Sequence, residues 1–205
     1  MASSDKKIRL TDLKRISILE AAVSEFQEYG YDGTSMDRIA STADVSKRTV
    51  YNHFPSKDDL FKAIIKEQLS CTVKDIGIDY DPDDSLEEQL SQMGVQYAES
   101  MAADDFMKLA RVVISRFIEA PEIAAATIGD KKDFGDGIES WIKAAVKDGR
   151  LDVPDAQFAA QQFCGLINEF SFWPQLIGSQ KKLTRKKMRE VVESSVAMFL
   201  NHYAT

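Results

Sequence analysis

Apolar residues recur at three- and four-residue steps along almost the whole chain, which is the spacing of amphipathic α-helices. No convincing alternating run of five or more residues indicates a β-strand. Five prolines and ten glycines separate the apolar segments. The pattern therefore predicts an all-α protein, and its later helices are expected at 85–102, 104–119, 121–148 with interruptions, 155–177 and 184–204.

The first sixty residues predict three helices with clear start and stop signals. The first helix ends at Gly30, because glycine readily adopts the left-handed conformation that closes a helix. Thr34 or Ser35 can cap a second, very short helix, and Ser46 can cap a third. Pro55 ends the third helix, and a longer fourth helix follows it.

The third helix has a polar face. Val50 and Phe54 are four residues apart and share the inner face, so the polar side chains between them point away from the core. These polar side chains are Lys47, Arg48, Tyr51 and Asn52. Two short helices joined by a turn of about four residues have the spacing of a helix-turn-helix DNA reader, which we place at about 34–53. On spacing alone, a small three-helix bundle with a solvated polar face fits equally well.

The residue types on this face suit DNA. Phosphates bind cations and the backbone N–H groups of helix N-termini, whereas base edges bind forked or short amphipathic side chains. Lys47 and Lys57 suit phosphates. Arg48 and Asn52 suit base edges, and Tyr51 suits a phosphate or a sugar. The residues predicted to contact DNA are Thr34, Ser35, Ser46, Lys47, Arg48, Thr49, Tyr51, Asn52, His53 and Lys57.

The formal net charge of −7 argues against nucleic acid, because phosphate-binding proteins are usually basic. The acidity is uneven, however. Residues 1–57 contain nine Lys and Arg against eight Asp and Glu, whereas residues 58–205 contain 17 against 25. The segment 45–57 has no carboxylate, so a local cationic face remains. The basic residues near the N-terminus form either a flexible arm on DNA or a solvated tail; they are Lys6, Lys7 and Arg9.

Residues 16–62 resemble the N-terminal DNA-binding domain of the tetracycline-repressor (TetR) family of transcriptional regulators. The resemblance rests on Phe26 and Gly30 at the end of the first helix, on TSMDRIA at 34–40 and on VSKRTVYNHFPSKDDLF at 45–61. The family usually has glycine at the positions of Asp44 and Arg48. Aspartate tolerates a left-handed turn, and an arginine in the groove can supply a preference for guanine.

The resemblance implies a ligand-responsive regulator, most often a repressor, that binds palindromic operator DNA as a homodimer. Its DNA-binding domain would cover residues 1–60, and a helical ligand-binding and dimerisation domain would cover 61–205. In that family the middle helices surround a small-molecule pocket and the last two form the dimer interface. A protein of another class also fits the helical pattern, namely an all-helical small-molecule binding or carrier protein with a non-functional DNA motif.

The C-terminal helices carry more apolar surface than one interior face requires. Their methionines and aromatic rings suit an apolar or aromatic effector, although plain core packing is the commoner reason for such residues. The predicted pocket residues are Met93, Tyr97, Met101, Phe106, Met107, Phe117, Trp141, Phe163, Asn168, Phe170 and Trp173. Asn168 or Glu169, polar in an apolar stretch, would orient the ligand or pair across the dimer. The predicted dimer residues are Phe172, Leu176, Val192, Val196, Phe199 and Tyr203.

Nothing in the sequence indicates an enzyme, a metal site or a cofactor. His53 and His202 are the only histidines, and His53 lies within the DNA motif. Cys71 and Cys164 lack a CxxC or Cys/His spacing, which favours two small core residues. We expect a cytoplasmic protein with no membrane partner, since the chain has neither a signal-peptide pattern nor a run of about 18 apolar residues.

Overall fold

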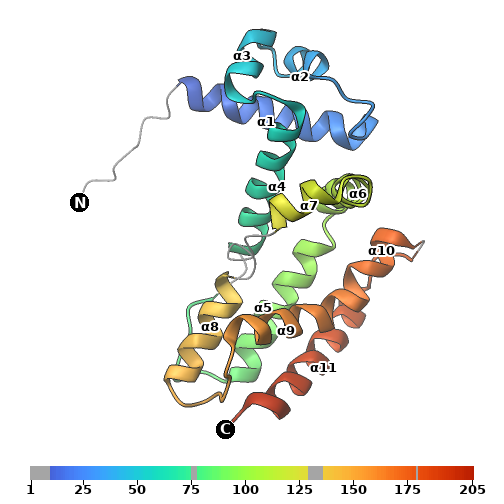
Figure 1. Cartoon of the computed structure of the whole chain (residues 1–205). Helices are drawn as coiled ribbons and strands as arrows, with labels where there is room; N and C mark the ends of the chain where they lie inside the picture. The colour runs from blue at the N-terminus through green and yellow to red at the C-terminus, as the bar shows by residue number, and fades with distance from the viewer. Residues whose placement is uncertain (1–9, 75–77, 129–135, 179) are drawn as a thin grey trace. The chain divides into compact units, whose positions relative to one another are not determined.

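The computed structural model describes residues 10–74, 78–128, 136–178 and 180–205, so the basic residues before Leu10 lie outside the described part. Within it the chain is helical and has no strand beyond an isolated bridge between Leu151 and Ala204, which confirms the all-α expectation. No helix of these ranges is both long and apolar enough to cross a membrane. The helices are α1 (Leu10–Tyr29), α2 (Met36–Thr42), α3 (Lys47–His53), α4 (Lys57–Lys74), α5 (Leu86–Met101), α6 (Asp104–Glu119), α7 (Pro121–Ile128), α8 (Asp136–Lys147), α9 (Ala156–Ser171), α10 (Trp173–Ile177) and α11 (Arg185–Tyr203) (Figure 1).

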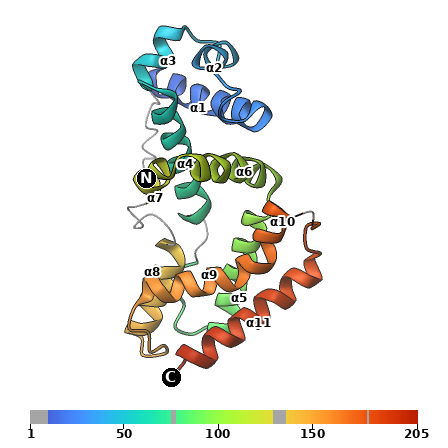
Figure 2. The ribbon, with the colours of Figure 1, turned by 45° about the vertical axis from the view of Figure 1, so that its right-hand side comes forward.

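The helices form two compact units. The first unit combines residues up to 67 with residues 111–129, and the second combines residues 68–110 with residues 130–205. The first unit therefore contains α1, α2, α3, much of α4, the second half of α6 and α7, whereas α5, α8, α9, α10 and α11 belong to the second (Figures 1 and 2). Each of α4 and α6 supplies residues to both units.

In the first unit, the local signals read from the sequence set the boundaries of the helices. Gly30 ends α1 with a backbone φ of +72°. Ser46 is the N-cap of α3, as predicted, and Ser35, one of the two candidates, is the N-cap of α2. Their hydroxyls accept the N–H groups of Thr49 (3.1 Å) and Arg38 (3.2 Å). The turn between α2 and α3 contains a left-handed residue, Asp44, with φ +52°. The tolerance of aspartate for this conformation accounts for the departure from glycine.

In the second unit, α5 packs against α9 and α11, and α8 packs against α9. The α5 helix approaches α11 closely at Gly94, where an added Cβ would lie 2.7 Å from Cγ1 of Val192. Trp141 of α8 is buried, and its indole N–H donates to Oε1 of Gln89 on α5 (3.0 Å). The core of this unit therefore lies between these helices, around Met93, Phe163 and Val192, none of which has any exposed surface.

The single helix expected at 155–177 is wrong, because the chain divides there into α9 and α10. Pro174 lacks the backbone N–H that a continuous helix requires, and its ring excludes the preceding turn. Phe172, with φ −116° and ψ −65°, is the residue between the two helices: it is the C-cap of α9 and the N-cap of α10. The apolar stripe continues through the break, so periodicity alone did not reveal it.

Candidate nucleic-acid interface and effector site

The α3 helix has one buried and one exposed face, as the spacing of its residues predicts. Val50 is fully buried and Phe54, which follows the helix, is 4% exposed. Tyr51 is 49% exposed, and the polar residues beside it are also on the surface. These surface residues are Lys47, Arg48 and Asn52. A helix that buries only its apolar side in the unit leaves this polar side free for another molecule.

The two cations at the start of α3 differ in their surroundings. Lys47 forms an ion pair with Asp37 of α2, and both side chains are more than half exposed. Exposed pairs of this kind are worth about 0 to 1 kcal/mol, so the lysine is released at little cost. The Arg48 side chain has no hydrogen bond or ion pair with any residue that the structure describes. Its guanidinium is therefore an available forked donor.

The side chains of Thr34 and Lys57 both form hydrogen bonds within the protein. Thr34 is 2% exposed, and its hydroxyl lies 3.0 Å from the Glu25 carbonyl oxygen and 2.9 Å from that of Gly30. The Lys57 ammonium donates to the carbonyl oxygens of Tyr31 (2.8 Å) and Thr34 (2.9 Å), and burial lowers its pKa. The side chain of Thr34 is therefore enclosed by the protein and does not face DNA, contrary to the prediction from the sequence. Lys57 keeps one of its three N–H donors for another partner.

The remaining predicted contacts lie at the two ends of α3. The hydroxyls of Ser46 and Thr49 are 2.8 Å apart, so the first turn of the helix is already capped. His53 is partly exposed, and its ring centroid lies 6.3 Å from that of Phe54.

A polar cluster that the sequence analysis missed holds α2 on α1. The carboxylate of Glu25 accepts hydrogen bonds from Oγ1 of Thr42 (2.7 Å) and Nε of Arg38 (2.9 Å). The hydrogen bond from Thr42 and the charge of Arg38 lower the pKa of Glu25. The Arg38 guanidinium also stacks on the ring of Tyr29, with its carbon 3.6 Å from the ring centroid. These contacts hold α2, which precedes the turn into α3, against α1.

The residues predicted to line an effector pocket are distributed over both units. Phe117 belongs to the first unit, whereas the other predicted residues belong to the second. Phe170 and Trp173 are exposed, and Phe106 and Asn168 are partly exposed. The remainder are buried in the second unit, namely Met93, Tyr97, Met101, Met107, Trp141 and Phe163.

Two buried polar atoms of the second unit lack a hydrogen-bond partner among the described residues, Oε1 of Gln96 and Oδ1 of Asn168. Nδ2 of Asn168 donates to the hydroxyl of Tyr97 (2.7 Å), while its Oδ1 is buried with no hydrogen bond. The Tyr97 hydroxyl in turn contacts Cys164, and burial raises the pKa of that thiol to about 11. Burial also raises the pKa of Tyr97. All three groups are therefore neutral at pH 7, and Oδ1 of Asn168 is an acceptor that no described residue satisfies.

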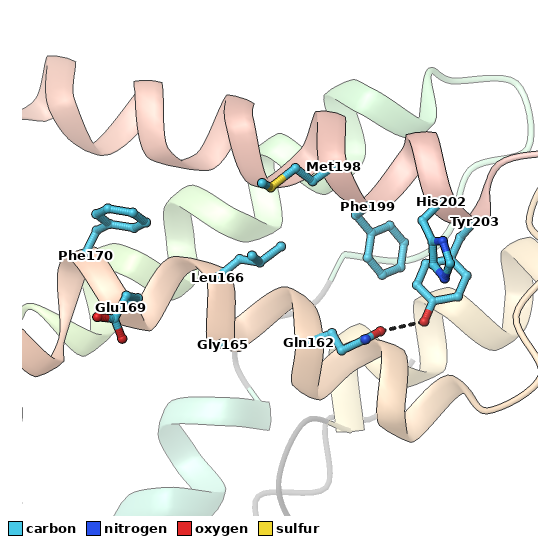
Figure 3. Close-up of a pocket in the computed structure, with 9 residues that line it drawn as sticks. All are labelled: Gln162, Gly165, Leu166, Glu169, Phe170, Met198, Phe199, His202 and Tyr203. Atoms are coloured by element: carbon cyan, nitrogen blue, oxygen red, sulfur yellow. Dashed lines mark hydrogen bonds between the residues drawn. The ribbon is translucent and has the colours of Figure 1, made fainter.

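The α9 and α11 helices border a groove of about 480 Å³ on the second unit (Figure 3). Phe170 and Met198, which line it, are each 53% exposed. At one end, the Tyr203 hydroxyl donates to Oε1 of Gln162 (2.5 Å). The full lining is Gln162, Gly165, Leu166, Glu169, Phe170, Met198, Phe199, His202 and Tyr203.

The six residues predicted for the dimer interface are buried within the single chain. None is more than 9% exposed, and Val192 and Val196 are almost fully enclosed. These six residues are Phe172, Leu176, Val192, Val196, Phe199 and Tyr203. They are core residues of one chain, and Phe199 and Tyr203 alone also border the groove. The solvent-facing side of α9 and α11 is formed by other residues, such as Phe170 and Met198.

A helix-turn-helix unit followed by a helical second unit defines a class of DNA-binding regulators, and comparisons identify the family. The profile described as bacterial regulatory proteins of the tetR family matches residues 18–64. The profile of the AefR-like transcriptional repressor C-terminal domain matches residues 88–205, which is more than half of the chain. The chain therefore belongs to the TetR family of transcriptional regulators. Because both halves match regulators, a carrier protein with a non-functional DNA motif is not favoured.

Individual relatives agree with this assignment. A crystal structure of a TetR family transcriptional regulator from Pseudomonas syringae pv. tomato is 42% identical and has a TM-score of 0.78, covering 95% of this chain and 99% of that one. The HTH-type transcriptional regulator RutR of Escherichia coli O157:H7 is 27% identical over 76% of this chain and 72% of its own. YhgD of Bacillus subtilis, also an HTH-type transcriptional regulator, is 30% identical over 67% and 69% of the two chains.

Proposed function

We propose that this chain is a ligand-responsive repressor that binds a palindromic operator as a homodimer, with α3 as the reading helix. The observation that carries the proposal is the two-sided character of α3, which buries Val50 and exposes Arg48, Tyr51 and Asn52. An exposed, unpaired arginine on a recognition helix suits the O6 and N7 acceptors of guanine. Two such helices related by a two-fold axis require an inverted repeat, with half-sites about one helical turn or a multiple apart.

The DNA flanking the gene itself is the first operator to test, with binding isotherms at several salt concentrations. We expect Lys47→Ala to weaken binding to matched and scrambled sites alike and to flatten the salt dependence, because a phosphate contact is lost. Arg48→Ala is expected to cost about 1 to 3 kcal/mol on the matched site and to relax its base preference. Lys108→Ala, which removes an exposed charge of α6, is the matched control. Unchanged affinity in both α3 variants would refute the assignment of the reading helix.

The outward side of α9 and α11 is the proposed dimer surface. Phe158 of α9 is 55% exposed, and Phe170 and Met198 are each 53% exposed. Exposed apolar side chains that line one groove, as Phe170 and Met198 do, are expected to be covered by another molecule. A second copy of the chain is that molecule, since TetR-family regulators dimerise and the family C-terminal domain covers both helices. Gly165, which lies in the groove of this face, allows a close approach of two helices.

For the effector, we propose an apolar or aromatic molecule that carries one hydrogen-bond donor. The buried thioether of Met93 and the rings of Tyr97 and Phe163 supply apolar contacts. Oδ1 of Asn168 supplies an acceptor that no described residue satisfies. Leaving such an atom unpaired costs about 1 to 3 kcal/mol, which a ligand donor recovers.

This effector class can be tested with phenols and their methyl ethers, which differ mainly in the donor. We expect 1-naphthol to raise the melting temperature and release the operator more strongly than 1-methoxynaphthalene, because binding to one state shifts the equilibrium toward it. Asn168→Leu is expected to remove this preference. A panel of such pairs that binds with equal affinity to the wild type would show that Asn168 does not recognise a donor.

A further inference from the structure

The first unit contains a cluster of charged and aromatic side chains around Tyr31. The guanidinium carbon of Arg116, on α6, lies 4.3 Å from the centroid of the Tyr31 ring, and the Lys57 ammonium lies 4.1 Å from the same centroid. Nη2 of Arg116 is 3.6 Å from Oδ1 of Asp58, and the Tyr31 hydroxyl donates to that carboxylate. Two cations therefore lie against the ring of Tyr31, and one carboxylate accepts from its hydroxyl.

This cluster continues to the start of the helix-turn-helix. Lys57 donates to the carbonyl oxygens of Tyr31 (2.8 Å) and Thr34 (2.9 Å). Thr34 directly precedes Ser35, the N-cap of α2. The Tyr31 ring also packs on Phe61 of α4, with the two centroids 5.1 Å apart. A chain of direct contacts thus runs from α6, through Tyr31, to the first residue of the reading motif.

Arg116 is an expensive residue for a purely structural contact. Its side chain is only 21% exposed, and its Nε is buried with no hydrogen-bond partner among the described residues. It also stands close enough to Lys57 for its charge to contribute to the lowered pKa of that lysine, after burial. An apolar side chain of similar length would fill the site without the cost of a desolvated cation. What only a guanidinium provides here is simultaneous stacking on Tyr31 and attraction to Asp58.

We propose that Arg116 is a positioning residue for DNA recognition. From α6, outside the reading helix, it fixes Tyr31 and Asp58 and, through Lys57, the start of α2, so that α2 and α3 keep the geometry that binds the operator. The inference rests on the proposed function, since it assumes that the first unit binds DNA. It differs from that proposal because it assigns part of the operator affinity to a side chain on α6, whereas the reading domain is formed by α1, α2 and α3.

The experiment compares full-length variants on operator DNA at several salt concentrations. Arg116→Met keeps the length of the side chain but loses the cation, whereas Arg116→Lys keeps the charge. We expect the methionine variant to bind about tenfold more weakly, which corresponds to a cation–π contact of about 1 to 2 kcal/mol, and the lysine variant to recover part of the loss. The salt slope should stay at its wild-type value, because Arg116 holds no phosphate. Lys108→Met, on the same helix, controls for the loss of one positive charge.

A second readout does not depend on DNA. Hydrogen exchange of the Arg38 and Ile39 amides, which bond to Ser35, reports the order of the first turn of α2. We expect faster exchange there in Arg116→Met than in Lys108→Met, with the amides of α9 unchanged.

Each outcome decides the proposal. Wild-type affinity in Arg116→Met, a flattened salt slope, or equal loss of protection in every helix would overturn it. If the wild type binds no DNA, the proposed function fails, and the exchange data alone decide whether Arg116 positions α2.

Discussion

Replacement of Gly165 tests the proposed dimer surface in a way that separates it from the folding of the chain. Gly165 lies in the middle of α9 and is exposed. A Cβ built there meets no atom of the described chain within 4 Å. Glycine inside a helix costs about 0.5 to 1 kcal/mol relative to alanine, so the isolated chain would gain from a side chain at this position. The presence of glycine at position 165 is explained if a helix of a second chain packs closely against α9 there.

The expected changes have opposite signs for folding and for association. Gly165→Ala should raise the free energy of unfolding of the single chain by about 0.5 to 1 kcal/mol. Gly165→Leu inserts a bulky side chain into the groove, and overpacking of a close contact costs about 1 to 3 kcal/mol. The dimer dissociation constant should therefore rise about tenfold to a hundredfold. Analytical ultracentrifugation measures the dissociation, and urea unfolding at protein concentrations below and above the dissociation constant measures the stability.

Gly94→Ala is the matched control, because that glycine is needed by the chain itself. An added Cβ there lies 2.7 Å from Val192 and 3.3 Å from atoms of Phe163 and Ile167, so this variant should destabilise the monomer. If Gly165→Leu dimerises as tightly as the wild type, the α9 and α11 face is not the dimer surface.

Two further predictions follow from the shifted pKa values. Because the folded pKa of Glu25 is lowered, its stabilising effect is complete above the ordinary glutamate pKa of about 4.3 and is lost as the pH falls through the folded value. Glu25→Gln should therefore flatten the acid side of a plot of unfolding free energy against pH. Cys164 has a pKa of about 11, so its thiol should react slowly with iodoacetamide at pH 8 in the folded chain and at the normal rate in urea. Rapid labelling of Cys164 itself in the folded chain, measured in a Cys71→Ser variant, would contradict its burial beside Tyr97.

The parts of the reading domain that the sequence predicts are those set by local interactions. A hydroxyl that caps a helix bonds to an N–H three residues away, which is why Ser46 could be identified from its position and the cap of α2 could be narrowed to Thr34 or Ser35. The left-handed turn at Asp44 is also a property of a few residues. The contacts of Thr34 and Lys57 were harder to predict, because their hydrogen bonds depend on how α1 and α4 pack together. Their residue types are compatible with a surface contact and with an internal one.

The same limit applies to the C-terminal helices. Periodicity identifies an apolar stripe but does not say which molecule covers it. Val196 and Phe199 were predicted to face a second chain, yet they are 1% and 3% exposed within one chain. Met198, between them in sequence, points outward and is 53% exposed. When a helix is apolar on more than one side, some of its apolar residues pack in the core of the chain and others contact a partner. Only the packing of α5, α9 and α11 shows which residues do which.

Three features of the described chain are not accounted for by its own contacts, and we propose a different partner for each. Gly165 weakens the middle of a helix without relieving any contact within the chain. Oδ1 of Asn168 is buried without a donor among the described residues, and the side chain of Arg48 lies exposed without a described partner. A second chain can close over the glycine, a ligand can satisfy the amide oxygen, and a guanine can accept from the guanidinium. Because Arg48 lies in the first unit, the operator test is independent of the other two substitutions, whereas Gly165 and Asn168 are three residues apart on α9 and their substitutions have to be measured together as well as singly.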